Sequence, residues 1–115
     1  MEMRQARRVH NYIVLHVRSK IRIGELAEAK KLSLFSFNRA FRGSFGYTPH
    51  EYVTRMRIAR AQRLMTVSHH MLSKIAVECG FVDQSNFKRH FRNVIGEAPA
   101  DWLARRGSSI ARPII

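Results

Sequence analysis

Two short stretches of this sequence combine basic side chains with amide or hydroxyl groups at helical spacing. The outward positions of the first stretch are Phe35, Asn38, Arg39 and Arg42. Those of the second stretch are Ser85, Lys88, Arg89 and Arg92. An arginine guanidinium can form two parallel hydrogen bonds with phosphate or with guanine, and an asparagine amide can do the same with adenine. These residue types predict contact with a nucleic acid.

The two stretches belong to a duplicated segment. Phe37, Arg39, Phe41 and Arg42 recur at one constant offset as Phe87, Arg89, Phe91 and Arg92, and the same offset relates Gly46 to Gly96 and Pro49 to Pro99. Upstream, Leu26-Ala27 recurs as Ile75-Ala76 with an offset one residue shorter, which a turn can absorb. A basic unit that occurs twice favours a periodic, anionic partner such as DNA.

Composition limits what a chain of this size can be. Its 115 residues can form one small body or two very small ones, and 45% hydrophobic residues place it among folded globular proteins. The chain has 21 Lys+Arg against 8 Asp+Glu, a formal net charge of +13, and arginine supplies 16 of the basic residues. This balance favours a polyanionic partner or an anionic membrane surface, and the preference for arginine favours nucleic acid.

Cysteine usage and hydropathy predict the compartment. Cys79 is the single cysteine, so no intrachain disulfide can form and a reducing cytoplasm is the simplest expectation. No apolar run approaches the roughly 18 residues of a membrane span, and the first residues lack the apolar core of a signal peptide. We expect a soluble protein without a membrane partner.

Periodicity and capping signals in the first half predict four helices. Apolar residues at helical spacing indicate a helix from Arg4 to about Arg18, a short one from Glu25 to Lys30, and a third from the cap Ser33 to about Ser44. Thr48-Pro49-His50-Glu51 is a capping box with proline at the first helical position, and it opens a helix to about Val67.

That fourth helix has apolar residues on two sides, which predicts a connecting helix packed against both repeats. Tyr52, Met56 and Ala59 cluster on one side, and Ile58, Ala61 and Met65 on the other.

The second half repeats the arrangement. We expect a short helix from about Met71 to Cys79, a turn at Gly80, a helix from the cap Asp83 to about Val94, and a last short helix opened by Pro99. Lys31 stands in the first repeat where the second has Gly80, so a left-handed turn there would cost up to about 1 kcal/mol more than with glycine. The tail from Gly107 shows no structured pattern.

A short helix, a tight turn and a longer helix with an apolar inner and a basic outer face form a helix-turn-helix, which occurs here twice. The second repeat carries Ile75-Ala76, Cys79-Gly80-Phe81, Asp83-Gln84-Ser85, Phe87, Phe91-Arg92, Gly96 and Pro99. With these residues the chain resembles the DNA-binding domain of the AraC/XylS family of bacterial transcription regulators, from about Val9 to Leu103. In form it is most similar to the short MarA and SoxS type of activator.

The resemblance implies an all-α fold of about seven helices, with two helix-turn-helix subdomains joined by a long central helix. The subdomains would be residues 1–48 and 68–106, the connecting helix 49–67, and a flexible tail 107–115. The family's base-reading positions fall on Phe35, Asn38 and Arg39 in the first repeat. In the second repeat they fall on Gln84, Ser85, Asn86, Lys88 and Arg89.

The same resemblance implies a function and its partners. We expect sequence-specific binding of double-stranded DNA by a monomeric domain, with two recognition helices in successive major grooves, and regulation of transcription together with RNA polymerase. The implied location is the bacterial cytoplasm, at the nucleoid when bound to DNA. The operator, the direction of regulation, and the presence of an effector-binding domain elsewhere in a longer protein are open.

Two functions from other classes compete with this interpretation. A basic RNA- or ribosome-associated module fits the charge, but a helical face cannot read the deep, narrow major groove of RNA. A nucleic-acid enzyme would need a catalytic constellation, and the sequence has no paired carboxylates, phosphate-binding glycine loop or Ser-His-Asp spacing. The six histidines and Cys79 lack zinc-ligand spacing, so we expect neither a metal nor a cofactor, and no enzyme.

Overall fold

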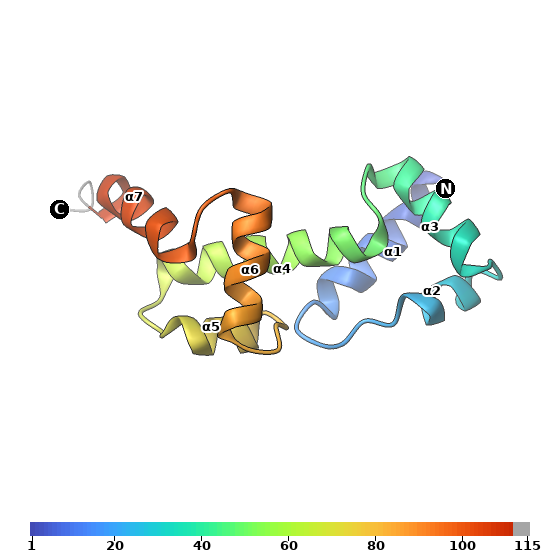
Figure 1. Cartoon of the computed structure of the whole chain (residues 1–115). Coiled ribbons are helices and arrows are strands. Elements are labelled where there is room, and N and C mark those ends of the chain that lie inside the picture. Colours follow the sequence, from blue (N-terminus) through green and yellow to red (C-terminus); the bar gives the residue numbers. More distant parts are fainter. Residues whose placement is uncertain (112–115) are drawn as a thin grey trace. The chain divides into compact units, whose positions relative to one another are not determined.

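Seven α-helices make up the part of the chain that the computed structural model describes, which is residues 1–111 for the backbone and 1–106 for the side chains. No strand occurs within these residues, which confirms the all-α fold class. The helices are α1 (Met3–Leu15), α2 (Ile23–Ala29), α3 (Leu34–Phe45), α4 (Pro49–Val67), α5 (Leu72–Glu78), α6 (Gln84–Ile95) and α7 (Pro99–Ala111) (Figure 1).

Helices α3 and α6 have the same kinds of N-terminal and C-terminal cap. The backbone N–H of Ser36 donates to the Ser33 hydroxyl at 3.1 Å, and that of Asn86 donates to the Asp83 carboxylate at 2.8 Å. Such a cap stabilises a helix by about 1 kcal/mol because it satisfies one of the free N–H groups of the first turn. Both helices end at a left-handed glycine, Gly46 with φ 81° and Gly96 with φ 97°.

The turn inside each helix-turn-helix is the same Schellman motif. In the first repeat the N–H groups of Lys31 and Leu32 donate to the carbonyls of Glu28 and Ala27. In the second repeat Gly80 and Phe81 donate in the same way to Val77 and Ala76. Lys31 has φ 58° and Gly80 has φ 93°, so the predicted left-handed turn is confirmed at both positions.

We expect Lys31→Gly to raise the free energy of unfolding by up to about 1 kcal/mol, because a left-handed residue with a Cβ is strained and glycine is not. The gain is reduced by the greater entropy of glycine in the unfolded chain. Urea unfolding followed by circular dichroism measures it. The reciprocal change Gly80→Ala serves as the control and should lower stability; a Lys31→Gly variant less stable than the parent would contradict the strain.

Helix α4 begins with the predicted capping box. The N–H and hydroxyl of Thr48 donate to the Glu51 carboxylate at 3.1 and 2.9 Å, and the Glu51 N–H donates to the Thr48 hydroxyl at 3.3 Å. The backbone hydrogen bond from Thr48 is the main reason why the pKa of Glu51 lies below its ordinary value, and the hydroxyl adds to it. The bounds of α4, Pro49–Val67, are those expected from the sequence.

The described chain divides into two compact units, each with its own apolar core: unit 1 is Met1–Met56 and unit 2 begins at Arg57. The core of unit 1 contains Val9, Ile13, Ala27, Phe37, Phe41 and Val53. That of unit 2 contains Ile58, Ala61, Met65, Ile75, Ala76, Cys79, Phe81, Phe87, Phe91 and Trp102. Helix α4 therefore supplies buried side chains to both cores, which confirms its two apolar sides.

Two expectations about these helices are wrong. Ala59 is exposed, because the first apolar side of α4 is formed by Tyr52, Val53 and Met56, which precede it in unit 1. Helix α7 continues to Ala111, although no structure was expected beyond residue 106. Once a helix is started, each added residue gains a hydrogen bond, so the weak helix formers Gly107 to Ser109 do not stop it. The last part of the predicted flexible tail, residues 112–115, lies outside the described residues.

Candidate nucleic-acid interface

One side of α3 is buried and the other presents predicted site residues to solvent. Phe37 and Phe41 are fully buried, and the Phe41 ring stacks on Phe45 with centroids 4.2 Å apart. Phe35, Arg39 and Arg42 are exposed, Phe35 with 74% of its surface accessible. A phenylalanine this exposed at the start of a helix contributes little to the core, so its apolar edge is available to a partner.

Helix α6 has the same two sides. Phe87 and Phe91 are fully buried, with their ring planes at 72° in an edge-to-face contact. Ser85, Lys88, Arg89 and Arg92 are exposed. Gln84 and Asn86 are half-buried in the first turn, where the backbone of Asn86 is held by the Asp83 cap. Their side chains are therefore less accessible than those of Lys88 and Arg89.

The sequence predicts that Asn38 points outward, but the structure shows it less exposed than that. It is half-buried, and its Oδ1 is a buried atom with no hydrogen-bond partner among the described residues. The helical phase puts Asn38 between the buried Phe37 and the exposed Arg39, at the border between the two sides of α3. A buried acceptor without a partner costs about 1–3 kcal/mol, and a donor brought by a ligand would satisfy it.

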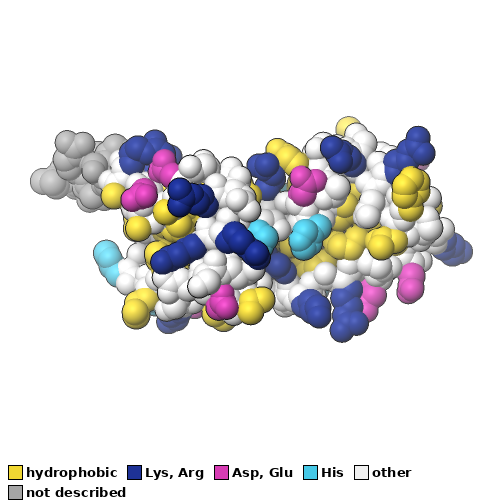
Figure 2. All heavy atoms as spheres, in the orientation of Figure 1, with side chains coloured by type: hydrophobic (Ala, Val, Ile, Leu, Met, Phe, Trp, Pro, Cys, Tyr) yellow, Lys and Arg dark blue, Asp and Glu magenta, His cyan; other side chains and the backbone are white. Residues whose placement is uncertain are grey.

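We call the exposed residues of the two helices the basic faces: Phe35, Arg39 and Arg42 on α3, and Ser85, Lys88, Arg89 and Arg92 on α6. Within residues 1–106, none of their cations is ion-paired at 4 Å or less. Arg105, outside these faces, pairs with Glu97 at 3.0 Å. In the view of Figure 2, Lys and Arg side chains are more widespread than Asp and Glu. The basic faces therefore keep their charge for an anionic partner.

Two exposed apolar side chains that the sequence did not single out lie beside these faces. Leu34 begins α3 and is 51% exposed, and Val82 precedes the α6 cap Asp83 and is 83% exposed. Each of them could have been found in the sequence from its position next to a helix cap, where no core residue is expected. Like Phe35 at the start of α3, Leu34 and Val82 can make apolar contacts with a partner at the N-terminal ends of α3 and α6.

The described residues hold no arrangement typical of a metal site or a membrane span. No group of three or more His, Cys, Asp or Glu in this part of the chain is placed to hold a metal ion, and Cys79 is buried in the core of unit 2. Within residues 1–111, every helix is too short or too polar to cross a lipid bilayer.

Comparison with known proteins shows the family. Residues 26–105, which contain both helix-turn-helix turns and both basic faces, match the sequence profile of a helix-turn-helix domain of the AraC/XylS type. The chain belongs to the AraC/XylS family. This is a family of DNA-binding transcription regulators rather than of enzymes.

Three relatives illustrate the match to this AraC/XylS-type chain. The probable transcriptional regulator LumQ of Photobacterium leiognathi is 37% identical over 94 residues, which are 82% of this chain and 38% of LumQ. The transcriptional activator RhaS of Salmonella paratyphi B is 34% identical over 85 residues, which are 74% of this chain and 31% of RhaS. The chain thus spans about a third of the length of these relatives.

The third relative is a solved structure. It is the DNA-binding domain of AdpA, a global transcriptional factor, in complex with a target DNA, and it is 26% identical in sequence. The likeness has a TM-score of 0.85 and covers 94% of this chain and 97% of that one. All seven helices therefore follow the architecture of an AraC/XylS DNA-binding domain.

Proposed function

We propose that this chain binds double-stranded DNA sequence-specifically and regulates transcription. The observation that carries the proposal is the pair of helices α3 and α6, each capped at its start, buried on a phenylalanine side and unpaired on a basic side. A helix built in this way fits the major groove, which is about 12 Å wide and shows the base edges. The likeness to a domain solved with its target DNA supports DNA over the RNA-associated alternative.

The DNA contact proposed for each side chain of α3 and α6 follows from the chemistry of that side chain. Arg39 and Arg89, repeat mates on the exposed side of α3 and α6, are proposed to pair with guanine. Asn38, Gln84 and Asn86 carry amides suited to adenine, Phe35 suits a thymine methyl group, and Ser85 and Lys88 can bond to either kind of base edge. Arg42 and Arg92, one turn further along each helix, lie where phosphate contacts would fix the register.

Two recognition helices in one chain favour a monomer that occupies two successive major grooves. The centres of the two half-sites would then lie about 10 bp apart on one face of the duplex. Regulation further implies contact with RNA polymerase, and the names of LumQ and RhaS support a regulatory role. The proposed activity is binding alone, without catalysis.

Arg39→Ala and Arg89→Ala test the proposal. Each should weaken binding to the operator by about 1–3 kcal/mol and change binding to scrambled duplex little, because a bidentate base contact is lost. Footprinting should show lost protection in one half-site for Arg39→Ala and in the other for Arg89→Ala. Titration against both duplexes at one salt concentration measures the energies.

Arg63→Ala is the matched control, since Arg63 is an exposed arginine of α4 outside the basic faces. Any contact it makes with DNA is expected to be to phosphate, so its loss should affect both duplexes alike. Equal losses on operator and scrambled duplex for Arg39→Ala and Arg89→Ala would show that α3 and α6 are not the readers. Protection of only one half-site per chain would contradict the two-groove arrangement.

A further inference from the structure

The first turn of α3 presents two adjacent apolar side chains to solvent. Leu34 is 51% exposed and Phe35 is 74% exposed, so neither is a core residue of unit 1. The polar side chains of this turn are bonded to each other: the Ser33 hydroxyl donates to the Ser36 hydroxyl at 3.0 Å and accepts from the Ser36 N–H at 3.1 Å. The outward surface at this end of α3 is therefore apolar.

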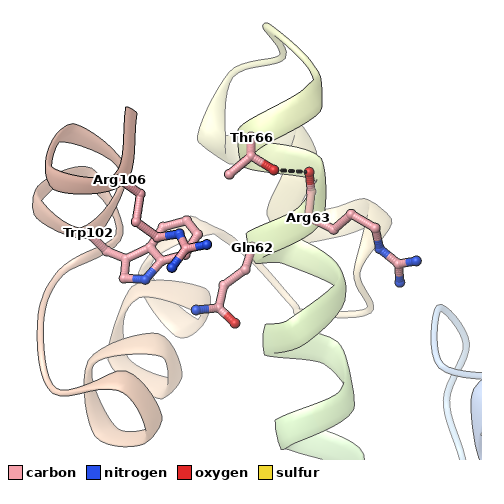
Figure 3. Close-up of a pocket in the computed structure, with 5 residues that line it drawn as sticks. All are labelled: Gln62, Arg63, Thr66, Trp102 and Arg106. Carbon is pink, nitrogen blue, oxygen red and sulfur yellow. Dashed lines mark hydrogen bonds between the residues drawn. The ribbon is translucent and has the colours of Figure 1, made fainter. Parts of the chain in front are cut away.

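Two other aromatic rings are each covered by an arginine. The Arg55 guanidinium lies 4.3 Å from the centroid of the Tyr47 ring in unit 1. In unit 2 the Arg106 guanidinium lies 5.1 Å from the centroid of the Trp102 ring, at a hollow of about 230 Å³ between α4 and α7 (Figure 3). Within residues 1–106, no cation lies over the Phe35 ring in this way. The exposed surface of Phe35 is thus available to a partner.

Leu34 and Phe35 lie one helical turn before two residues at base-reading positions of the family. Residues four apart are neighbours on a helix surface, so Leu34 adjoins Asn38 and Phe35 adjoins Arg39. Side chains of a helix tilt toward its N-terminus, so the apolar pair extends this surface toward the start of α3. The pair is therefore continuous with the basic face of α3, and one helical turn spans about two base pairs of DNA.

The surroundings of the pair favour DNA over an apolar protein surface as its partner. Residues 30–50 contain two Lys and two Arg and no Asp or Glu, which suits a polyanion. In the major groove the methyl group of thymine is the apolar group among the base edges, and phenylalanine is one of the side chains that contact it. The other bases present hydrogen-bond donors or acceptors there, which leucine and phenylalanine cannot satisfy.

The second repeat lacks this apolar pair. At the constant offset of the repeat, Gln84 takes the place of Leu34 and Ser85 that of Phe35. An amide and a hydroxyl form hydrogen bonds with base edges and gain little from a methyl group. Val82 is exposed in this repeat, but it precedes the cap of α6 and so lies outside the helix. The two recognition helices therefore differ in chemistry at the same position.

We propose that Leu34 and Phe35 bind thymine methyl groups, so that the half-site read by α3 requires thymine at this step and the half-site read by α6 does not. The contact rests on the proposed function, since it needs α3 to lie in a major groove. It makes the operator asymmetric, because two half-sites read by related helices do not share one sequence. It also sets the orientation of the chain on the duplex, because the thymine-dependent half-site lies under α3.

Replacement of thymine by deoxyuridine removes the methyl group and keeps the hydrogen-bonding edge of the base. The operator is first selected by the chain from a random duplex pool, and the α3 half-site is the one that loses protection with Arg39→Ala. Burial of one methyl group is worth about fourfold in affinity, so uracil throughout the α3 half-site should weaken binding about fourfold for one methyl contact and about 15-fold for two. Uracil throughout the α6 half-site should weaken it less than about twofold.

Exchange of the pair for the residues of the second repeat tests which side chains are responsible. Leu34→Gln combined with Phe35→Ser should make uracil and thymine in the α3 half-site equivalent within about twofold, and a repeated selection should lose the preference for thymine there. Leu15→Ala is the matched control and should keep the full effect of uracil, because Leu15 is 79% exposed on α1 of the same unit. All three replaced side chains are exposed, and circular dichroism checks folding.

Several results would overturn the thymine contact. Equal affinity of the parent chain for the uracil and thymine operators would show that no methyl group is bound. Equal losses for uracil in the two half-sites, or an unchanged effect of uracil in the double variant, would show that the apolar pair is not the reason. Equal weakening of operator and scrambled duplex by the double variant would assign the pair to sugar and phosphate contacts.

The same experiment separates this contact from the proposed function. A random pool from which the chain enriches no site would contradict sequence-specific binding, and the thymine contact with it. An enriched site that is indifferent to uracil would contradict the thymine contact alone.

Discussion

Binding to duplex DNA is expected to weaken by about 10³- to 10⁵-fold between 50 and 200 mM salt. The chain has a formal net charge of +13, and no cation of the basic faces is ion-paired within residues 1–106, so DNA binding should release the counterions of about 6–10 phosphates. The plot of log K against log salt should then be linear with a slope of about −5 to −9. Fluorescence anisotropy of a labelled duplex at four or more salt concentrations measures it.

Single variants refine the salt experiment. If Arg42 or Arg92 contacts phosphate, its replacement with alanine should lower the magnitude of the slope by about 1. Arg105→Ala is the control, because Arg105 is already paired with Glu97 at 3.0 Å and should leave the slope unchanged. Circular dichroism at each salt concentration confirms that the chain stays folded. An affinity that hardly responds to salt would remove the electrostatic basis of the proposed function.

The largest expected effect on stability is that of Phe91→Ala, about 3–5 kcal/mol, because it opens a cavity beside Phe87 and Trp102 in the core of unit 2. A small domain is stable by only about 5–15 kcal/mol, so this change should leave unit 2 near its unfolding threshold. Trp102 is the single tryptophan and lies in that core, so its fluorescence during urea unfolding follows unit 2.

Phe41→Ala, the repeat mate, is the matched variant. It opens a comparable cavity in the core of unit 1, where Phe41 contacts Phe45 and Tyr52. We expect it to shift the transition seen by circular dichroism at least as much as the transition seen by Trp102 fluorescence. Phe91→Leu, which keeps most of the volume, should cost less than about 1.5 kcal/mol. Identical shifts of the tryptophan transition by Phe41→Ala and Phe91→Ala would contradict two separate cores.

Local features of this AraC/XylS-type chain could be predicted from its sequence because they depend on neighbouring residues. The caps Ser33 and Asp83, the capping box at Thr48 and the left-handed turn at Lys31 are each decided within a few residues, and the structure confirms all four. The buried phenylalanines of α3 and α6 follow from helical periodicity alone. The repeat and the excess of arginine indicate an anionic partner, and the motif residues of the second repeat carry the resemblance to the family.

Features that depend on packing between helices could not be read in this way. Periodicity places Asn38 on the outward side of α3, but its Oδ1 is buried. The sequence alone did not reveal that His10 and Tyr52 are hydrogen-bonded in unit 1 while Gln62 and Trp102 leave a hollow in unit 2. The sequence by itself determined where most helices begin and which residues form their basic faces, because short-range hydrogen bonding and hydrophobic periodicity fix them. Only the tertiary structure decided which polar atoms are covered and where space remains, because both depend on side chains that lie far apart in the chain.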